Sequence, residues 1–326
     1  MHTFLIIGGD SRQDYLEQYL KRDGFPVLRW PGGAESSATA DGSAAIATAM
    51  EQADIILGPV PFTKNGTHLF DCPAESRSQE ESAASVSITA LLSGLTNRHT
   101  LFGGNIPKQI ISHCAQLGIS VYDFMKMEEV ALKNTVATAE GAIGEAITLS
   151  PGTFHGSRCL VIGFGRCGET LAEKLKGLDA QVTAADCSAP RLALAYALGF
   201  SPVQMKQPFS GSSTFLSAFD FIFNTVPAPV LDRSALRLLN TDAVLIDIAS
   251  GPGGIDLSSG IASDGDSISD GSSSSDDSSS SGCSTNTAPK AHRLCIKRCP
   301  GLPGRYCPKA AAEILYQAIL EHLPPQ

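Results

Sequence analysis

A six-residue run, GFGRCG at 163–168, has the residue types and the spacing needed to hold a phosphate group. The first N–H groups of a helix lack partners within the helix, and together with the positive end of its dipole they attract an anion. In this interpretation Gly163 permits the turn, Gly165 lets the backbone approach the phosphate, and Gly168 lets the helix pack on its strand. The run therefore indicates a nucleotide site.

The elements around the run support this interpretation. An apolar stretch at 159–162 predicts a buried parallel strand, and the apolar spacing over 169–176 predicts a helix. A second strand at 181–185 ends at Asp186, where a dinucleotide fold places a carboxylate against the adenosine ribose. The order of strand, glycine turn, helix and acid predicts a dinucleotide site. A purely structural glycine-rich turn and a nucleoside methyl-donor site are the alternatives.

Two later strands, expected at 219–224 and 243–248, end in polar loops that belong to the same edge of a parallel sheet. Each loop residue taken alone is equally well explained as part of a strand-ending turn, and Asp247 as a turn cap. The candidate cofactor-binding residues are Gly163, Gly165, Arg166, Cys167, Gly168, Asp186, Asn224, Thr225, Val226, Pro227, Asp247, Ala249 and Ser250.

The whole chain alternates between apolar strand-like segments and amphipathic helical ones, which predicts an α/β protein. We expect two Rossmann-like open parallel-sheet domains joined by a helical link. The predicted parts are an N-terminal, substrate-side α/β domain at 1–124, a linking helix at 125–150 that is broken near Thr138, a dinucleotide-binding domain at 151–306, and a C-terminal helix at 307–326 that packs back on the first domain or stands apart.

A Ser/Asp-rich segment at about 258–287 interrupts the alternation, and its composition predicts a disordered insertion. An acidic metal-binding tract is the alternative. A group of cysteines and a histidine near it invites a zinc interpretation, but no paired CxxC is present and unrelated thiols are favoured. We therefore expect no metal; the residues in question are Cys283, His292, Cys295, Cys299 and Cys307.

Composition limits the class of protein. The chain has 326 residues, 43% of them hydrophobic and 17% charged, which suits two buried cores. The net charge of −9 comes without a basic block, so nucleic acid is not an expected partner. No apolar run is long enough for a membrane span, the first residues lack a signal-peptide pattern, and the nine cysteines are an odd number. These features predict a cytoplasmic protein with no membrane association.

Seven motifs, in this order, resemble the family formed by the A subunits of dipicolinate synthase. The resemblance implies an oxidoreductase of endospore-forming bacteria that oxidises a dihydrodipicolinate-type intermediate of the lysine pathway to dipicolinate during sporulation. It implies NAD or NADP as cofactor and a flavoprotein-like B subunit, and we also expect a homo-oligomer. The motifs are IIGGDSRQ at 6–13, LFGGNIP at 101–107, VYDFMKMEEVALKNTVATAEGAI at 121–143, HGSRCLVIGFGRCG at 155–168, FDFIFNTVPAPVLD at 219–232, DIASGPGGID at 247–256 and GLPGRYCPKAAAEI at 301–314.

The chain departs from the family pattern in three places. The family commonly has a small residue followed by Arg where this chain has Asp186 and Cys187, and Ala310 replaces a hydroxyl residue. The serine tract is an insertion. Asp186 would favour NAD by repelling a 2′-phosphate, whereas the resemblance is to enzymes linked with NADP, so cofactor choice stays open.

A dicarboxylate substrate needs cationic partners, and arginine matches a carboxylate with two donors. Arg12 follows the first strand, where it is expected to face an interdomain cleft, and Arg305 and Lys309 precede the last helix. Glu140 is either a helix-start acid or a proton acceptor, and His155 is favoured as a structural residue over a base. Arg12, Glu140, Arg305 and Lys309 are the catalytic candidates, with surface charges as the alternative.

Two other functions stay open from the sequence. One is a nucleotide-sensing regulatory protein without catalysis, which would keep the glycine run at 163–168 and could dispense with the cations. The other is a 2-hydroxy acid dehydrogenase-like enzyme, which would require an arginine and a His-Glu pair in the second half of the chain.

Overall fold

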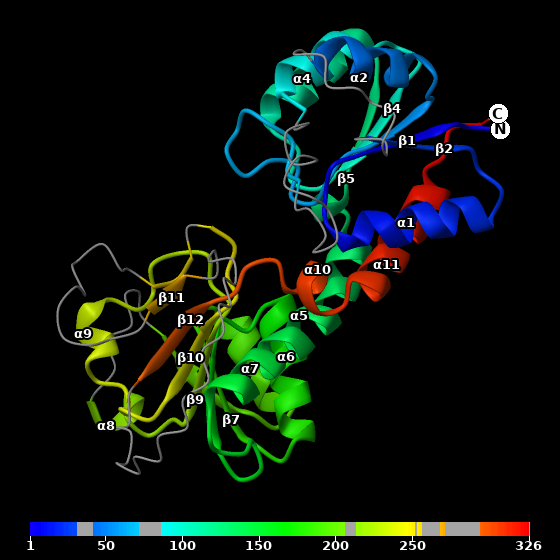
Figure 1. The fold of residues 1–326 in the computed structure, drawn as a ribbon. Coiled ribbons are helices and arrows are strands. Elements are labelled where there is room, and N and C mark those ends of the chain that lie inside the picture. The colour runs from blue at the N-terminus through cyan, green and yellow to red at the C-terminus, as the bar shows by residue number, and fades with distance from the viewer. Residues whose placement is uncertain are drawn as a thin grey trace, which may run out of the picture. The chain divides into compact units, whose positions relative to one another are not determined.

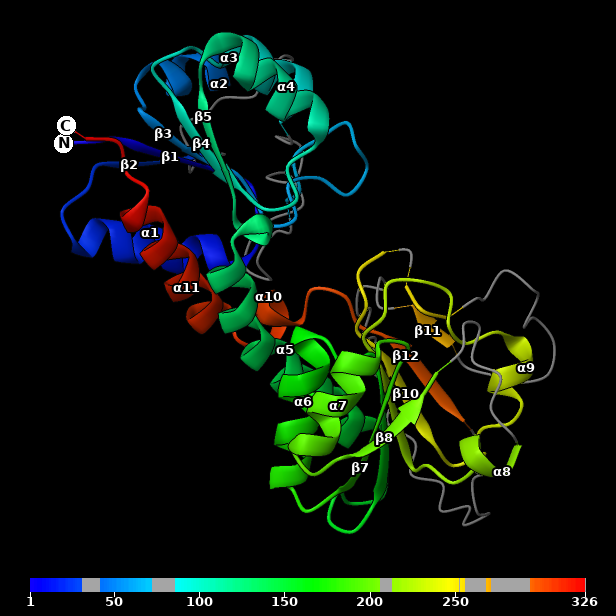
Figure 2. The same ribbon diagram turned by 180° about the vertical axis from the view of Figure 1, so that it is seen from behind.

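The computed structural model divides the chain into two compact units, Met1–Asn134 with Pro303–Gln326, and Thr135–Leu302. The linking helix expected at 125–150 is thus shared between the two units. The boundary expected at 306, between the dinucleotide-binding domain and the C-terminal helix, lies within the first unit. Two views of the ribbon show their elements (Figures 1 and 2). The structure describes residues 1–30, 42–71, 86–205, 213–251, 253–255, 268–270 and 294–325.

The N-terminal unit contains a five-stranded parallel sheet in the order β2-β1-β3-β4-β5. Its strands are β1 (Phe4–Ile7), β2 (Val27–Trp30), β3 (Ile55–Leu57), β4 (Thr100–Gly103) and β5 (Ser120–Asp123). Its helices are α1 (Ser11–Arg22), α2 (Gly42–Glu51), α3 (Ile88–Gly94), α4 (Lys108–Leu117), the 3-10 turn η2 (Phe124–Lys126), α10 (Leu302–Tyr306) and α11 (Pro308–Glu321).

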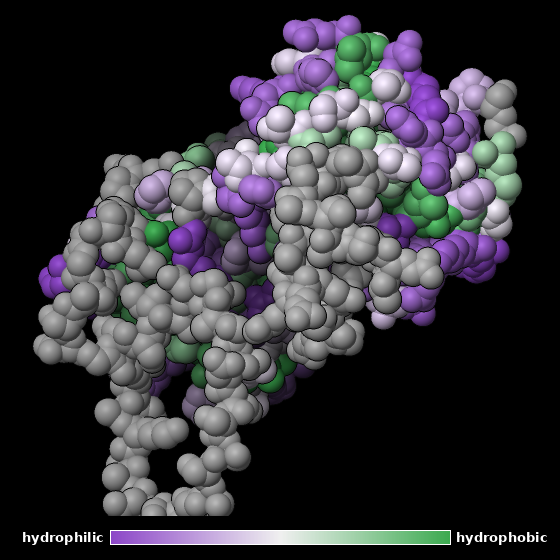
Figure 3. Space-filling view, turned by 45° about the horizontal axis from the view of Figure 1, so that its top comes forward, coloured by the Kyte–Doolittle hydropathy of each residue, from purple (hydrophilic) through white to green (hydrophobic). Residues whose placement is uncertain are grey.

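Helices cover both faces of this sheet. Successive side chains of a strand point to opposite faces, so each strand contributes to two cores. In β1, Leu5 and Ile7 pack in one core with residues of α2, α3 and α4. Phe4 and Ile6 pack in a second core with residues of α1 and α11. The C-terminal helix therefore lies on the N-terminal sheet, beside α1. On the face drawn in Figure 3 the surface of this unit is mainly hydrophilic, with small hydrophobic patches.

The second unit contains a seven-stranded parallel sheet in the order β11-β12-β10-β9-β6-β7-β8. Its strands are β6 (Arg158–Ile162), β7 (Gln181–Asp186), β8 (Ser201–Gln204), β9 (Phe221–Asn224), β10 (Val244–Asp247), β11 (Ile268–Asp270) and β12 (Cys295–Arg298). Its helices are α6 (Arg166–Gly177), α7 (Ala189–Ala197), α8 (Ser213–Leu216) and α9 (Arg233–Leu236), and α5 (Glu128–Leu149) enters it from the first unit.

The order of these strands locates the place where a ligand can bind. The chain runs from β6 outward through β7 to β8, then returns to the other side of β6 with β9 and β10. In open sheets of this kind, ligands bind beyond the carboxyl ends of the strands at the point where the order reverses. Here that point lies between β6 and β9.

The predicted α/β class with two open parallel sheets is confirmed, with differences in detail. Helix α5 is continuous, so the break predicted near Thr138 is wrong. The three residues of β11 pair with β12, so for them the prediction of a disordered insertion is wrong; the remainder of 258–287 lies outside the described residues. In the part of the chain that the structure describes, no helix is long and apolar enough to cross a membrane.

Candidate functional site

The glycine turn at the carboxyl end of β6 requires glycine at two positions for its own packing. Gly163 has a φ of 89°, in the left-handed region, and a Cβ there would lie 2.4 Å from Thr225 Oγ1. A Cβ on Gly168 would lie 1.9 Å from the carbonyl oxygen of Gly163. The geometry is consistent with the expected roles of Gly163 in the turn and of Gly168 in helix packing.

Gly165 is different, because no atom of the residues that the structure describes crowds it. It precedes α6 in an extended conformation, with φ −90° and ψ −164°, and provides no side-chain cap for the helix. The nearest atom to a Cβ placed there is Arg191 Nη1 at 3.6 Å, an ordinary contact. The helix N-terminus is therefore uncapped by a side chain and open on the Gly165 side, as a bound phosphate would require.

Asp186, at the end of β7, is pinned to this turn. Its Oδ2 accepts a hydrogen bond from the N–H of Phe164 at 2.7 Å, and its Oδ1 accepts one from the N–H of Ser188 at 2.8 Å. Arg191 Nη1 lies 3.5 Å from Oδ2. Burial raises the pKa of Asp186, but the two N–H groups and the charge of Arg191 outweigh it and hold the pKa below its ordinary value. The carboxylate is thus anionic and holds the glycine turn in shape.

The loops after β9 and β10 are joined by a buried polar network. Asn224 Nδ2 donates to Asp247 Oδ1 at 2.8 Å, and Asp247 also accepts from the N–H groups of Ala249 and Gly254, at 3.1 and 3.0 Å. Asn224 and Asp247 are both fully buried. These two candidates hold the loops in place and do not present their polar groups to a ligand.

Thr225 lies next to the glycine turn, because its hydroxyl donates to the carbonyl oxygens of Ile162 and Gly163 at 3.1 and 3.2 Å. Arg166, in the first turn of α6, is exposed, whereas Cys167 is half-buried and burial raises the pKa of its thiol. The other cofactor candidates at this edge follow β9 and β10, with side chains from half-buried to exposed except for the buried Ala249; they are Val226, Pro227, Ala249 and Ser250.

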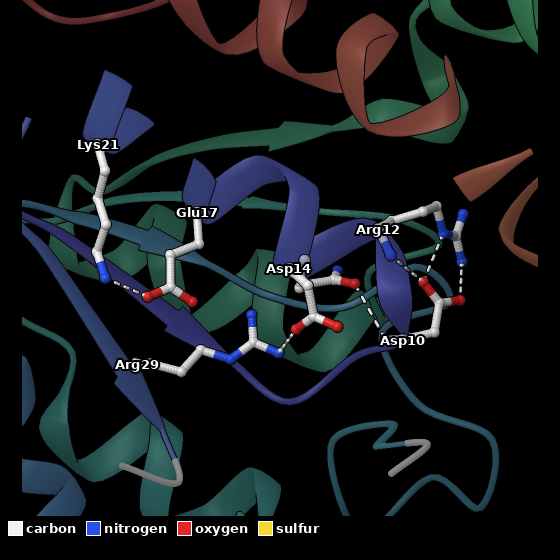
Figure 4. A network of polar contacts seen from close by, with 7 residues as sticks. Asp10, Arg12, Asp14, Glu17, Lys21 and Arg29 are labelled. Carbon is white, nitrogen blue, oxygen red and sulfur yellow. Dashed lines mark hydrogen bonds and ion pairs between the residues drawn. The ribbon is translucent and has the colours of Figure 1, made fainter. Parts of the chain in front are cut away.

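Arg12, in the N-terminal unit, is held by Asp10, the residue that caps its helix (Figure 4), and by the backbone of Val60. Its Nε and Nη2 donate to the two carboxylate oxygens of Asp10 at 2.8 and 2.7 Å, and Nη2 also donates to the carbonyl of Val60. Its side chain is only 10% exposed. A substrate carboxylate at Arg12 would have to compete with Asp10.

Helix α10 lies directly on this pair. A Cβ on Gly304 would be 2.6 Å from Asp10 Oδ2 and 2.9 Å from Arg12 Nε, so the α10 backbone touches both groups. The structure therefore brings Arg12 and the segment that carries Arg305 together. Arg305 is exposed, and its guanidinium lies 5.9 Å from the centre of the Tyr306 ring. Lys309 is also exposed, and its backbone carbonyl accepts a hydrogen bond from the Tyr19 hydroxyl at 3.5 Å.

Glu140 and His155 lie away from the glycine turn. Glu140 sits in the middle of α5, so the alternative of a helix-start acid is wrong, and its 52% exposed side chain forms an ion pair with Lys174 at 2.8 Å. His155 is exposed, and its Nδ1 lies 3.3 Å from Asp179 Oδ2. The described residues contain no group of three His, Cys, Asp or Glu side chains that could hold a metal, and Cys283 and His292 lie outside them.

The residue that sequence reasoning missed is Arg191, in the first turn of α7. It contacts both the open side of Gly165 and Asp186. The signal that could have found it is the helix start just before it, since Ser188 at the N-cap followed by Pro190 is a typical helix-start pattern.

Two family models match adjoining parts of the chain. One, described as the N-terminal domain of the A subunit of dipicolinate synthase, matches residues 3–125, and the other, described as the NAD binding domain of D-isomer specific 2-hydroxyacid dehydrogenases, matches residues 125–253. The A subunit of dipicolinate synthase from Bacillus subtilis (strain 168) is 26% identical over 217 residues, which are 66% of this chain and 61% of that protein. The match thus spans less than two thirds of the relative's length.

Solved structures share the fold over nearly the whole chain. The A chain of dipicolinate synthase from Bacillus subtilis has a TM-score of 0.71 at 22% identity, covering 98% of this chain and 95% of its own. The corresponding subunit from Bacillus halodurans has a TM-score of 0.71 at 21% identity, covering 99% and 98%. D-lactate dehydrogenase from Escherichia coli has a TM-score of 0.51 at 16% identity, and the match covers 76% of this chain and 74% of that protein. At these identities the likeness shows the fold.

Proposed function

Because the chain belongs to the family of dipicolinate synthase A subunits, we propose that it oxidises a dihydrodipicolinate-type intermediate to dipicolinate with a nicotinamide cofactor. The observation that carries this proposal is the open glycine turn between β6 and β9. Gly165 is uncrowded, the start of α6 is not capped by a side chain, and the match to an NAD-binding domain covers this segment.

The residues present fit such a cofactor. The N-terminus of α6 and Gly165 would hold its pyrophosphate, and Thr225 with the loops after β9 and β10 would border its nicotinamide half, across the reversal point of the sheet. A bound nicotinamide accepts a hydride, and formation of the aromatic ring favours the oxidation. What remains for this chain is to bind and orient the substrate.

We propose that Arg305 and Lys309 bind the carboxylates of the substrate. Both are exposed, and Arg305 belongs to the helix whose Gly304 rests on the Asp10–Arg12 pair. Arg12, whose guanidinium is shared between Asp10 and Val60, positions that helix in this proposal and does not bind substrate directly. The proposal takes two further points from the family, namely a B-type partner and a role in sporulation, and it keeps the expectation of a homo-oligomeric assembly.

Anaerobic incubation of the purified protein with the aspartate semialdehyde-derived intermediate and either NAD or NADP tests the function. Dipicolinate absorbance should appear with wild type and not with Gly165→Val. Arg305→Ala should raise the KM for the intermediate about tenfold or more, since a charge-assisted contact contributes ~1.5–3 kcal/mol, and should leave dinucleotide affinity unchanged.

The outcomes separate the possibilities. Dinucleotide binding without turnover, both for the protein alone and after addition of a candidate B-type partner, would favour a nucleotide-sensing regulator. Oxidation of 2-hydroxy acids in place of the cyclic intermediate would favour the dehydrogenase alternative. A normal KM in Arg305→Ala would remove that residue from the substrate site while leaving the reaction itself in place.

A further inference from the structure

Asn105 is held in a backbone conformation that residues with a side chain rarely adopt. It follows β4 in the N-terminal unit, and its φ of 55° lies in the left-handed region. Asp179, in the second unit, is the only other non-glycine residue with a positive φ among those that the structure describes. Asparagine tolerates this conformation better than most residues, but glycine adopts it without strain. The chain therefore carries a polar side chain where glycine would fit the backbone better.

A buried carboxylate fixes this conformation. Asp123, at the end of β5, has a side chain that is only 5% exposed. Its Oδ1 accepts a hydrogen bond from the N–H of Asn105 at 2.9 Å, and its Oδ2 accepts one from the N–H of Ile106 at 3.1 Å. The Asn105 side chain itself is exposed, and no hydrogen bond to the described residues holds its carboxamide. The carboxamide is thus available to a ligand on a backbone that is already fixed.

Asn105 belongs to the same edge of the N-terminal sheet as Arg12. Strands β1, β3 and β4 are neighbours in this sheet, and Arg12, Val60 and Asn105 follow them in that order. The loops are joined, because Arg12 donates to the carbonyl of Val60 and the N–H of Phe62 donates to the carbonyl of Gly104 at 2.6 Å. Ligands of open α/β sheets bind at this edge, beyond the carboxyl ends of the strands.

The same edge supports the helix to which the proposed function assigns a substrate carboxylate. Gly304 of α10 rests on Asp10 and Arg12, and the next residue of that helix is Arg305. The proposed substrate has two carboxylates, and a carboxamide offers two N–H donors for one of them. A hydrogen bond to an ionised acceptor is also roughly twice as strong as one between neutral groups.

We propose that Asn105 is a further substrate-binding residue, whose carboxamide donates to a carboxylate of the cyclic dicarboxylate. The inference rests on the proposed function and adds a contact from the loop after β4 to those of Arg305 and Lys309. Asp123 is a positioning residue in this inference, because it acts through the backbone of Asn105. The competing role for Asn105 is that of a turn residue without contact to substrate.

The left-handed backbone makes the test selective, because Asn105→Gly removes the carboxamide and keeps the turn. The melting temperature of this variant should equal or exceed that of wild type, since glycine adopts a φ of 55° without strain. Its KM for the intermediate and its Kd for dipicolinate, measured by calorimetry, should both rise about tenfold or more, as expected when a hydrogen bond to a charged group is lost. Dinucleotide affinity should stay unchanged.

Two further variants sharpen the test. Asn105→Asp keeps the shape of the side chain and tolerates the same φ, but its charge repels a dianion, so KM and Kd should rise more than in Asn105→Gly. Asp179→Gly makes the matched backbone change at the other left-handed residue, which is exposed, and should leave both constants unchanged.

The outcomes are distinct. A normal KM and a normal Kd in Asn105→Gly would overturn the inference and leave the proposed function intact, with Asn105 as a turn residue. If Asn105→Gly unfolded at a lower temperature than wild type, Asn105→Asp would decide, and normal constants there would overturn the inference. Equal losses of dinucleotide affinity would also overturn it. If wild type neither bound dipicolinate nor turned over the intermediate, the proposed function would fail, and this inference with it.

Discussion

β1 and β6 are two buried strands that are each followed by a glycine turn and a helix, and the two turns differ in whether a side chain fills them. After β1, a Cβ on Gly8 would be 2.7 Å from the carbonyl oxygen of Phe70, and one on Gly9 would be 2.3 Å from the side chain of Gln13. Asp10 caps α1, and Gln13 completes a capping box. The N-terminus of α1 is thus capped by side chains of the protein itself.

After β6, the second turn is left open. Gly165 stands where Asp10 stands in the first turn, immediately before its helix, and it supplies no side chain to α6. A glycine turn before a helix is therefore not by itself a phosphate site. What distinguishes the two turns is whether a neighbouring side chain already occupies the helix N-terminus.

Closing the open turn should have the largest effect. Gly165→Val would put a branched side chain where a phosphate must approach, and dinucleotide affinity should fall at least a hundredfold in calorimetry. The fold should persist, because the backbone there is extended and the nearest atom is 3.6 Å from the new Cβ. Gly177→Val is the control and should bind normally, because it lies at the other end of α6, where the new Cβ would have no other described part of the chain within 4 Å. Unchanged affinity in Gly165→Val would move the site elsewhere.

Much of this arrangement could be predicted from the sequence. The glycine run, the strand before it and Asp186 at the end of the next strand are local features with clear spacing. The capping pair Asp10 and Gln13 is equally local, yet its consequence for Arg12 depends on a contact with Val60, 48 residues away. Long-range contacts of this kind cannot be inferred from spacing.

The parts of the structure that were missed have separate reasons. Arg191 was not recognised because α7 was not predicted, and β12 was not recognised because Cys295–Arg298 is short and mixed in polarity. β11 has a polar sequence and becomes a strand by pairing with β12 at the edge of the sheet. In both strands, pairing with neighbours outweighs local preference.

Removing the cap from the closed turn should lower the free energy of unfolding and leave dinucleotide affinity unchanged. Asp10→Ala removes the cap of α1, which contributes ~1 kcal/mol, and leaves the buried Arg12 without its carboxylate, which adds a cost of ~1–3 kcal/mol. Chemical denaturation should therefore show a free energy of unfolding lower by about 2–4 kcal/mol. Asp10→Asn keeps the cap but not the charge, so its loss should be smaller. If dinucleotide affinity fell as well, the two turns would not be independent.

The acid that shapes the open turn should make stability depend on pH. The pKa of Asp186 is lowered in the folded protein, so its contribution is present above the unfolded value of about 3.9 and is lost as the pH falls through the folded pKa. Asp186→Asn should be less stable than wild type at neutral pH, and the difference should shrink on acidification below about pH 4. Thermal unfolding of both proteins across this pH range measures the difference in stability. A difference that stays constant with pH would contradict the stabilising role of the ionised Asp186.

The smallest effect is expected at Glu140, which lies on α5 outside both turns. Its side chain is 52% exposed and forms an ion pair with Lys174, and exposed pairs of this kind contribute only ~0–1 kcal/mol. A general base must instead reach the proton that it removes, within hydrogen-bond distance or through one water. Glu140→Gln should therefore leave both kcat and the pH profile within about twofold of wild type, and Lys174→Ala should behave in the same way. A large fall in kcat in Glu140→Gln with a normal KM, absent from Lys174→Ala, would show that the carboxylate accepts the proton and that the site extends beyond the glycine turn to α5.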